Sequence, residues 1–511
     1  MMDNIKVDVY TLCYNEIKIA PFVVQYWKEY ANKVVVYDNG SDDGSIEYLG
    51  KFPFIEIRHF DSDGLNDEIN IQIKNSVWKE SRHKSDFVVV CDFDECIYSP
   101  NLIEELKYMK ENGITLCKPR EYVMLSDEFP VFDSNKFSYQ IMKTGYSGSS
   151  KYLIFDPNKI SEINYLPGAH ICNPIGEIKE YDGNRIFNFH HAEMCMDYTI
   201  DKYHSRQNRF SYTNKKNGYG TFYFVSDDEI ISDINNKLKN KCVNIINIVN
   251  PKIKIFVCTF DKEVKIKSDI FVPLQVGRTS SPVKFNYLGD DTGDNISNKN
   301  KYYSEQTGVY WVWKNMQDNH PDYVGFCHYR KYPYFRKGIH QQEFRCSKEF
   351  YVDTGGMDEK YINDAILERD VVCIAPFFYS DRSIETLYKS IHISEDFDIL
   401  KEIINEIYPE YVDSFNKITR QIPGLFVPYN IYIMKWKIFD EYCSFIFSIF
   451  EKMEGRIDKK KHTGYQSRVF GYLAERLLSV FLFKHEYKMS IVPCSILDEY
   501  KEPNYTIQDK N

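Results

Sequence analysis

Apolar residues along the first hundred positions alternate between short continuous runs and helix-spaced positions. The runs "IKVDVYTLC" (5–13), "KVVVYD" (33–38) and "DFVVVC" (86–91) are typical of buried strands. Between them, "PFVVQYWKEYA" (21–31) and residues 65–85 carry apolar residues at helical spacing, which predicts helices. Strands that alternate with helices predict a parallel, doubly wound sheet, in which ligands bind at the carboxyl ends of the strands.

A similar order begins again in the second half of the chain. "KIKIFVCTF" (252–260) predicts a new first strand, followed by a helix over 302–319 and a buried strand over 322–327. The stretch 225–250 has the pattern of a polar amphipathic helix that runs to Pro251. Residues 395–500 are expected to be mostly helical.

The length of the chain supports a division into domains. With 511 residues, it exceeds the size at which a single hydrophobic core stops growing. We therefore predict an α/β protein with two Rossmann-like domains, at 1–225 and 251–511, the second with a largely helical C-terminal part. A helical linker is expected at 226–250.

Composition and charge exclude several classes of protein. The net charge of −10 argues against a nucleic-acid backbone as the main partner. An aromatic content of 16% suits stacking on sugars or bases as well as core packing. The 13 cysteines show no metal-ligand spacing, and the start "MMDNIKVDVYTLCYNE" has no signal-peptide pattern, so reduced thiols in a cytoplasmic protein are expected. No apolar run is long enough to span a membrane.

Two aspartates mark the end of the strand at 86–91. Asp92 and Asp94 are spaced two apart, so both side chains project to the same side of an extended segment. Carboxylate oxygens there suit Mg²⁺ or Mn²⁺, which commonly bridge to substrate phosphates. The alternative interpretation is an aspartate pair in a surface loop or at a helix N-cap.

Three segments of the first half resemble a known enzyme family when they are taken in order. "TLCYNE" (11–16), "VVVYDNGSDDGS" (34–45) and "VVVCDFDE" (88–95) are similar to motifs of the family 2-like glycosyltransferases of the GT-A fold, over about residues 5–200. The resemblance implies an inverting hexosyltransferase. It implies that Asp92 and Asp94 hold Mg²⁺ or Mn²⁺ on a sugar-nucleotide diphosphate, and that the nucleotide lies along Asn15, Glu16, Asp38 and Asn39.

The resemblance also implies a third metal ligand and a catalytic base. A late histidine often completes such metal sites, and we favour His191 over His190 and His170. A base must take the proton of the acceptor hydroxyl. "YVMLSDEFP" (122–130) offers Asp127 and Glu128, with Glu121 as a further possibility; the usual acidic signature before Q-x-x-R-W is absent.

Six separated segments of the second half resemble another domain family, over about residues 252–490. They are "VPLQVGR", "GDDTGDNISNKN", "EQTGVYWVWKN", "VGFCHYRKY", "NIYIMK" and "GYLAERLL". The family occurs in bacterial capsule and O-antigen loci, sometimes fused to another transferase, and its characterised members are β-galactofuranosyltransferases. The resemblance implies a second glycosyltransferase that uses UDP-galactofuranose or a related donor.

The second domain replaces the aspartate pair with basic groups. When "SDFVVVCDFDE" is aligned with "PDYVGFCHYRK", His328 stands opposite Asp92 and Arg330 opposite Asp94. Because a guanidinium offers a planar fork of donors matched to phosphate, the diphosphate could be bound without a metal. The alternative interpretation is a structural ion network between "HYRKY" and the acidic loop "GDDTGD".

Further candidates in the second domain rest on weaker patterns. Asp291, Asp294 and Asn295, beside Asp290, could hold the ribose of the donor or a metal ion, although a tight turn also explains a segment rich in Asp, Gly and Asn. Glu475 is a candidate catalytic carboxylate, and Glu305 and Asp396 are equal alternatives. An internal ion pair with Arg476 is the structural interpretation of Glu475.

These patterns together predict a bifunctional glycosyltransferase of capsular or surface polysaccharide synthesis. UDP-sugars are the expected donors, and the acceptor is a lipid-linked or growing glycan. Such an acceptor would bring the protein to the inner face of the cytoplasmic membrane, yet no basic amphipathic helix indicates attachment. One alternative is a single catalytic domain with a glycan- or nucleotide-binding domain. Another is a nucleotidyltransferase, which would usually carry a Gly-rich phosphate loop that is missing here.

Overall fold

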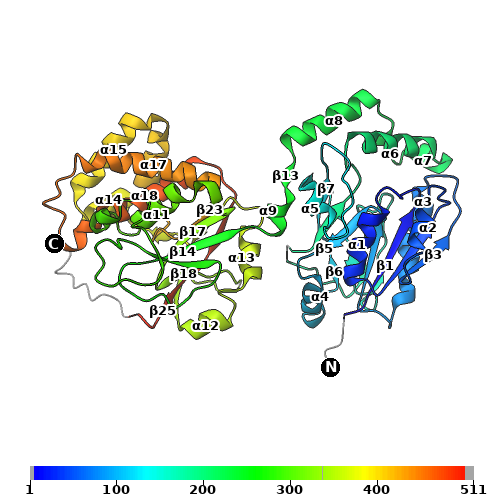
Figure 1. Cartoon of the computed structure of the whole chain (residues 1–511), viewed down its shortest axis with the longest axis horizontal. Coiled ribbons are helices and arrows are strands. Elements are labelled where there is room, and N and C mark those ends of the chain that lie inside the picture. Colours follow the sequence, from blue (N-terminus) through cyan, green and yellow to red (C-terminus); the bar gives the residue numbers. More distant parts are fainter. Residues whose placement is uncertain (1–4, 184, 337, 501–511) are drawn as a thin grey trace. The chain divides into compact units, whose positions relative to one another are not determined.

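The chain forms two compact units, Met1–Asn250 and Pro251–Asn511. The computed structural model describes residues 5–183, 185–336 and 338–500. Each unit is built on its own sheet, in which parallel strands alternate with helices (Figure 1). The predicted fold class, two Rossmann-like α/β units of which the second has a largely helical C-terminal part, is confirmed. The assignment of 1–225 and 251–511 as transferase domains with a linker at 226–250 stays a prediction.

The first unit has a six-stranded sheet in the order β3-β2-β1-β4-β9-β6. Strands β1 (Val7–Cys13), β2 (Lys33–Asp38), β3 (Ile55–His59) and β4 (Phe87–Asp92) run parallel, as the apolar runs predict. Strand β9 (Ile154–Phe155) pairs antiparallel with β4 and with β6 (Leu116–Cys117), so β6 runs in the direction of β4. The crossover helices are α1 (Ala20–Tyr30), α2 (Ser45–Leu49) and α3 (Asp67–Ser76).

A second, five-stranded sheet completes the first unit, in the order β13-β8-β7-β12-β5. Its strands are β5 (Glu95–Tyr98), β7 (Arg120–Met124), β8 (Thr144–Ser147), β12 (Phe187–His190) and β13 (Val243–Asn244). A separate hairpin pairs β10 (Ile160–Glu162) with β11 (Ile175–Gly176). Because β5 begins where β4 ends, the Asp92–Glu95 turn links the two sheets.

The remaining helices of the first unit lie between or after the strands of these sheets in the chain. They are α4 (Leu102–Glu111), α5 (Ser138–Met142), α6 (Met196–Asn208), α7 (Tyr212–Asn217), α8 (Asp227–Asn240) and α9 (Ile245–Val249). The N-terminus of α8 has a capping box, in which Ser226 and Glu229 satisfy each other's backbone N–H groups. Its buried Ile230 and Ile234 pack with Leu125 in a small apolar cluster of this unit.

The second unit has a ten-stranded sheet whose parallel part runs in the order β16-β15-β14-β17. These strands are β14 (Ile253–Thr259), β15 (Phe271–Gln275), β16 (Leu288–Gly289) and β17 (Tyr323–His328). The sheet continues through β18 (Lys331–Pro333), β19 (Glu343–Cys346), β20 (Val371–Ile374), β23 (Tyr432–Lys435), β24 (Met489–Val492) and β25 (Cys494–Leu497). A small pair joins β21 (Phe377–Tyr379) to β22 (Gly424–Phe426).

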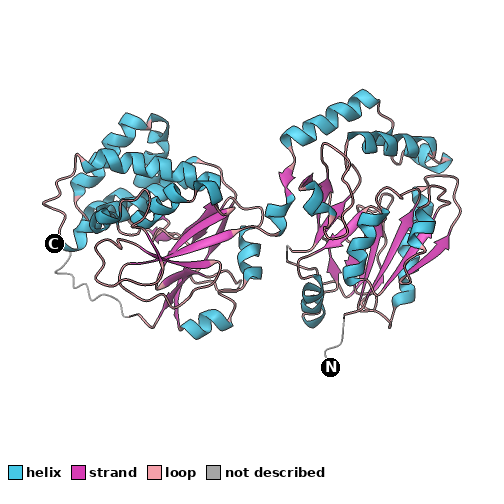
Figure 2. Cartoon of the chain, viewed as in Figure 1, coloured by secondary structure: helices cyan, strands magenta, loops and turns pink. Residues whose placement is uncertain are grey.

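Helices lie along the sheet of the second unit (Figure 2). Most of them belong to the later part of that unit. They are α10 (Asn300–Tyr303), α11 (Gln306–Asn315), α12 (Lys348–Asp353), α13 (Glu359–Ile366), α14 (Ile384–Ile391), α15 (Ser394–Ile407), α16 (Val412–Arg420), α17 (Trp436–Glu454) and α18 (Val469–Lys484). The single helix expected over 302–319 is interrupted between α10 and α11. The break occurs because Ser304 adopts φ 51° and ψ −131°.

All 13 cysteines are free, and all except Cys172 and Cys242 are buried. No helix in the described part of the chain combines the length and the apolar character that a membrane crossing requires.

Candidate functional site

The carboxyl ends of β1 and β2 carry two polar loops that hydrogen-bond to each other. The Asn15 side chain donates to the Asp42 carboxylate at 2.8 Å and accepts from the Asp42 backbone N–H at 2.9 Å. The buried Asp38 carboxylate accepts from the backbone N–H groups of Gly40 and Ser41 and from the Ser41 hydroxyl. Asn15 lines the smaller of the two cavities described below, whereas Asp38 lines neither and holds the loop after β2 in place.

Lysines from two distant segments neutralise Asp92, the last residue of β4. Lys74 Nζ of α3 lies 2.6 Å from Asp92 Oδ1, and Lys151 Nζ lies 3.2 Å from Oδ2. Both lysine side chains are almost fully buried. Burial would raise the pKa of Asp92, but the two ammonium groups outweigh it and lower the pKa below its usual range.

Asp94 has a different set of partners on the other side of the turn. Lys202 Nζ lies 2.7 Å from Asp94 Oδ2, and His190 Nε2 lies 3.4 Å from Oδ1. Burial alone would raise the pKa of Asp94 and lower that of His190. The attraction of Lys202 and His190 instead holds the Asp94 pKa well below its usual range. In turn, Asp94 and Glu121 raise the His190 pKa to about 10.

Two cavities meet at this pair of aspartates. One, of about 330 Å³, extends from the polar loops and is lined by Asn15, Glu16 and Asn39 among others. The other, of about 560 Å³, lies on the side of the second sheet. Asp92 and Asp94 line both cavities, so a ligand in either would contact the same carboxylates.

Helix α6 presents cationic side chains to the smaller cavity. Lys202 and Arg206 are spaced by one helical turn, and Arg209 follows the helix; all three line the cavity. Lys202 Nζ also lies 3.5 Å from the Glu16 carboxylate, and the Arg209 guanidinium donates to Asn39 Oδ1 at 2.5 Å. The smaller cavity therefore combines carboxylates with cationic groups suited to a diphosphate.

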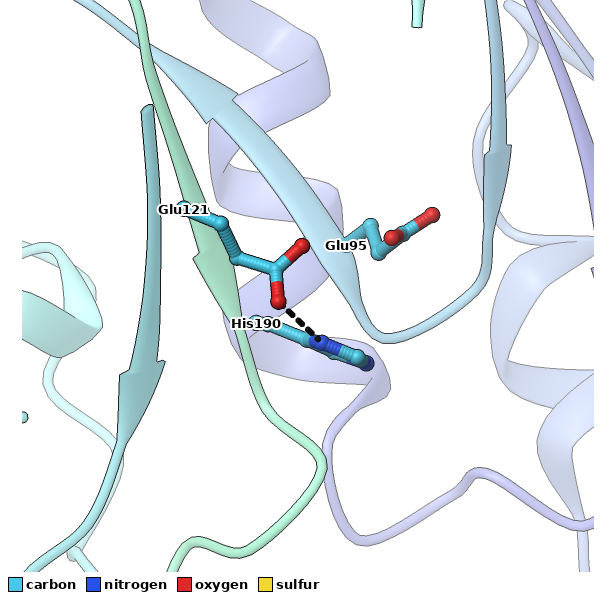
Figure 3. A group of neighbouring side chains, drawn as sticks. All are labelled: Glu95, Glu121 and His190. Atoms are coloured by element: carbon cyan, nitrogen blue, oxygen red, sulfur yellow. Dashed lines mark hydrogen bonds and ion pairs between the residues drawn. The ribbon is translucent and has the colours of Figure 1, made fainter. Parts of the chain in front are cut away.

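Glu95, Glu121 and His190 form a group whose ligand atoms lie within 4.8 Å of one another. Figure 3 shows the side chains of Glu121 and His190 pointing toward each other, with Glu95 beside them. His190 Nδ1 lies 3.4 Å from Glu121 Oε1. Glu95 already has an ammonium partner, since Lys151 Nζ lies 2.9 Å from its carboxylate.

Asp94, which lies next to His190 of this group, offers a further carboxylate for a divalent cation. The Asp94 Oδ1 and His190 Nε2 atoms, 3.4 Å apart, can share one cation at the usual ligand distances of about 2.0–2.6 Å. An oxygen and nitrogen donor set of this kind is within the range that Mn²⁺ accepts. That Asp92 and Asp94 hold a metal ion stays a prediction.

His191, the metal ligand favoured from sequence, points elsewhere. Its side chain is fully buried, with Nε2 2.7 Å from the Ser138 hydroxyl and Nδ1 3.4 Å from the Asp94 backbone oxygen. Burial lowers the pKa of His191 to about 4. It lines neither of the two cavities, whereas His190 and His170 both line the larger one.

The three candidate bases of the first unit also separate in the structure. Asp127 and Glu128 follow β7 in an exposed segment and line neither cavity. Glu121 on β7 is buried and lines the larger cavity. It accepts from Asn188 Nδ2 at 3.2 Å and lies beside His190. Of the three candidates, Glu121 is the one that lines a cavity together with Asp92 and Asp94.

In the second unit, His328 occupies the end of β17 and Arg330 does not share its cavity. His328 lines a cavity of about 430 Å³, and Arg330 is not among the residues around it. The half-buried Arg330 guanidinium has an Nη1 atom without a hydrogen-bond partner. The two residues that replace Asp92 and Asp94 in sequence therefore face different surroundings.

The acidic loop at 290–295 is held together by its own contacts. Fully buried Asp290 accepts from the backbone N–H groups of Gly277 and Arg278. Asp291 pairs with Arg278 at 3.4 Å. Asp294 accepts from the Tyr310 hydroxyl at 3.1 Å, and the Asn295 side chain accepts from the Ser297 backbone N–H at 3.3 Å. These contacts fit the turn interpretation, and none of these four residues lines the 430 Å³ cavity.

Glu475 sits in the ion pair that its sequence neighbours suggest. Its carboxylate lies 2.6 Å from Arg476 Nη1 and accepts from the Tyr429 backbone N–H at 3.0 Å. Burial raises the pKa of Glu475. Of the alternatives, Asp396 pairs with buried His462 at 2.9 Å, and Glu305 lines the cavity beside His328.

Sequence reasoning missed the cations of the first site. Lys74, Lys151, Lys202 and Arg206 have no motif, and each reaches the aspartates from a different distance along the chain. The one sequence signal is that Lys74 lies within the apolar pattern of "INIQIKNSVW" (69–78), where a lysine at a buried position requires a partner.

A family model described as a domain of unknown function, DUF4422, matches residues 254–486. This range falls within the segment whose six motifs resemble a polysaccharide-locus family. No curated protein sequence matches the chain.

Several solved structures match part of the chain. "WbbM bifunctional glycosytransferase apo structure" is 26% identical, with a TM-score of 0.43, over 50% of this chain and 48% of that one. TarS of S. aureus, residues 1–349, is 14% identical, with a TM-score of 0.22, over 46% and 71%. GalNAc-T7 with UDP, GalNAc and Mn²⁺ is 10% identical, with a TM-score of 0.20, over 24% of each chain. The chain thus spans about half the length of WbbM.

Proposed function

We propose that the first unit transfers a sugar from a nucleotide-sugar donor to a glycan acceptor. The observation that carries this proposal is the position of Asp92 and Asp94 at the junction of two cavities. The smaller cavity, with its polar loops and the cations of α6, suits the nucleoside diphosphate. The larger cavity, lined by Tyr146, Tyr203 and Tyr223, suits a sugar acceptor, because aromatic rings stack on sugar faces.

Charge in the smaller cavity is arranged to receive the leaving group. Lys202 and Arg206 provide donors for the diphosphate oxygens. A divalent cation on Asp92, Asp94 and His190 would act as a Lewis acid that offsets the charge of the departing diphosphate. The asparagine and aspartate loops after β1 and β2 would fix the nucleoside by hydrogen bonds.

Glu121 is the base that the geometry favours over Asp127 and Glu128. In the proposed transfer, Glu121 accepts the proton of an acceptor hydroxyl while the hydroxyl oxygen bonds to the anomeric carbon. The bond from that carbon to the diphosphate breaks, and its electron pair leaves with the diphosphate. A single displacement of this kind inverts the anomeric configuration.

We propose that the second unit is a transferase as well, which makes the chain bifunctional. Support comes from its parallel strands, in which His328 ends β17 as Asp92 ends β4 of the first unit. A cavity lined by His328 lies at this strand end. UDP-galactofuranose as its donor, a capsular or surface polysaccharide as the product, and a cytoplasmic location near a lipid-linked acceptor rest on the sequence resemblance.

The test is release of nucleoside diphosphate from a panel of sugar nucleotides, UDP-galactofuranose included, with the full chain. We expect turnover of one donor to require Mn²⁺ or Mg²⁺, to stop with EDTA, and to fall at least a hundredfold in Asp94→Asn. Asp133→Asn, which alters a half-buried aspartate that lines neither cavity, should leave turnover unchanged. Donor turnover that is indifferent to both EDTA and Asp94→Asn would refute the first site.

A further inference from the structure

The cavity of the second unit lies where three parts of that unit converge. It is lined by the strand ends at Thr259 and His328, by Glu305 at the junction of α10 and α11, and by Arg468 just before α18. Ligands of open parallel sheets bind at this edge. The position corresponds to that of Asp92 in the first unit, yet the chemical lining differs.

The charge around this cavity is cationic. Lys301 and Arg468 both line it, and Glu305 is the one carboxylate among the described residues that do so. The smaller cavity of the first unit, in contrast, is lined by the carboxylates of Glu16, Asp92 and Asp94 among others. Within the described part of the chain, the group of residues able to hold a metal ion lies in the first unit.

His328 does not add to the positive charge at neutral pH. Burial lowers the pKa of its imidazole, and its Nε2 lies 2.6 Å from the Tyr429 backbone oxygen. A carbonyl oxygen can only accept, so Nε2 carries the proton and Nδ1 of the neutral ring is an acceptor. The counter-charges for an anion in this cavity are therefore Lys301 and Arg468.

The backbone around Glu305 is strained and held in place by side chains. Ser304, Tyr429 and Asn430 all have positive φ, at 51°, 67° and 51°. Asn430 Nδ2 donates to Glu305 Oε1 at 2.5 Å, and Arg468 Nε donates to the Ser304 hydroxyl at 3.0 Å. Backbone strain of this kind persists where surrounding contacts fix it, and it concentrates at ligand sites.

We propose that this cavity binds the diphosphate of a nucleoside-diphosphate donor without a divalent cation, with Arg468 and Lys301 as its counter-charges. The inference rests on the proposed role of the second unit as a transferase and names the residues of its donor site. Arg468 offers the planar fork of donors that matches phosphate oxygens, and Lys301 adds a point charge. Glu305 then faces the uncharged part of the ligand.

The experiment is calorimetric titration of UDP, with GDP, ADP and pyrophosphate as further probes, in EDTA. The full chain carries Asp92→Asn and Asp94→Asn, so that the first site cannot hold a metal. We expect one binding event to remain, weakened at least tenfold by Arg468→Gln and by Lys301→Gln. Glu305→Gln removes a repulsive charge and should leave binding equal or tighter.

Matched variants separate this site from a general effect of charge. Arg456→Gln, which alters an exposed ion pair of the same unit with Glu406, should leave the affinity unchanged, and Arg468→Lys should recover part of it. Absence of any metal-free binding, or binding that both Arg468→Gln and Lys301→Gln leave unchanged, would overturn the inference. Because Lys301 is exposed, its variant remains informative if Arg468→Gln fails to fold. Metal-dependent turnover is measured separately, in the unmutated chain. A negative result for the cavity of the second unit therefore leaves the proposal for the first unit standing.

Discussion

Buried lysines are the main electrostatic feature of the first site at the scale of single residues. Lys74 and Lys151 hold Asp92, and Lys202 holds Asp94. Each ammonium occupies part of the space around a carboxylate that a divalent cation would use. In the proposed function, metal binding must free the carboxylates, and the released ammonium groups would then lie beside the cavities, where they suit the phosphates of a donor.

Lys151→Met should destabilise the first unit strongly. The change leaves buried Glu95 and Asp92 without their shared partner, and removing one member of a buried ion pair costs about 3–5 kcal/mol. Chemical unfolding of the full chain measures the loss. Lys159→Met, which removes an exposed pair with Glu177, should cost less than about 1 kcal/mol. Equal effects of the two changes would contradict the assignment of Lys151 as a buried counter-charge.

His392 should make the second unit sensitive to acid. Burial first, and then the nearby Arg476, lower its pKa from 6.5 to about 3, with a weaker opposite effect from Gln466. Between these pH values the unfolded chain binds a proton that the folded one does not, so stability falls as pH falls below about 6.5, by up to about 1.4 kcal/mol per pH unit.

The check is the unfolding midpoint at pH 7 and pH 5. His392→Gln should reduce the difference between the two midpoints, whereas His204→Gln, at an exposed histidine paired with Asp227, should not. An unchanged difference in His392→Gln would mean that other groups dominate the acid response.

Sequence and structure agree best where a local pattern decides the outcome. Asp92 and Asp94 were predicted at a strand end because the apolar run before them is local and continuous. Their partners could not be predicted, because Lys74, Lys151 and Lys202 lie 18, 59 and 108 residues from the aspartates that they contact. Only the folded sheet brings these segments together.

Strands β4 and β17 show how one element supports two chemistries. Each has six residues, the first five buried and the last half-buried, which is Asp92 in one and His328 in the other. The apolar pattern predicts both strands. The break between α10 and α11 could not be foreseen, since the residues of 302–319 keep helical spacing and the positive φ of Ser304 depends on contacts such as that of Arg468.

Helix α6 should determine nucleotide affinity in the first unit. Lys202→Gln removes a charge-assisted donor from the smaller cavity, so the Mn²⁺-dependent part of UDP binding should weaken about 10- to 100-fold, for a charged hydrogen bond worth about 1.5–3 kcal/mol. Lys239→Gln, on the exposed last turn of α8, is the matched control. If Lys202→Gln bound UDP as tightly as the control does, α6 would have no part in donor binding.

The whole molecule contains two large apolar cores, one in each unit. One core is built around β1, β4 and α1, and the other around β14, β17, α17 and α18. No buried cluster of described residues contains members of both cores. Each of the two similar strand-and-helix patterns in the sequence therefore forms a hydrophobic core of its own. The extra strands β23–β25 were missed within 395–500, since short apolar runs among helices do not reveal a sheet.

Unfolding of the full chain should occur in two transitions. Proteins of several domains commonly depart from two-state behaviour, and each unit here has its own core. Lys151→Met should lower one midpoint and His392→Gln should alter the acid response of the other, as followed by urea titration at several pH values. A single transition that responds to both substitutions would show that the units unfold together.

The burial of the thiols has a practical consequence for labelling. Eleven of the 13 cysteines are buried, and burial raises the pKa of the partly exposed Cys172 to about 11. The pKa of Cys242 is raised by burial as well. Maleimide dyes react with thiolates, so at neutral pH the native chain should take up dye slowly. A cysteine introduced at an exposed position of each unit would then react first, which allows a fluorescent donor and acceptor pair to be attached without removing any natural thiol.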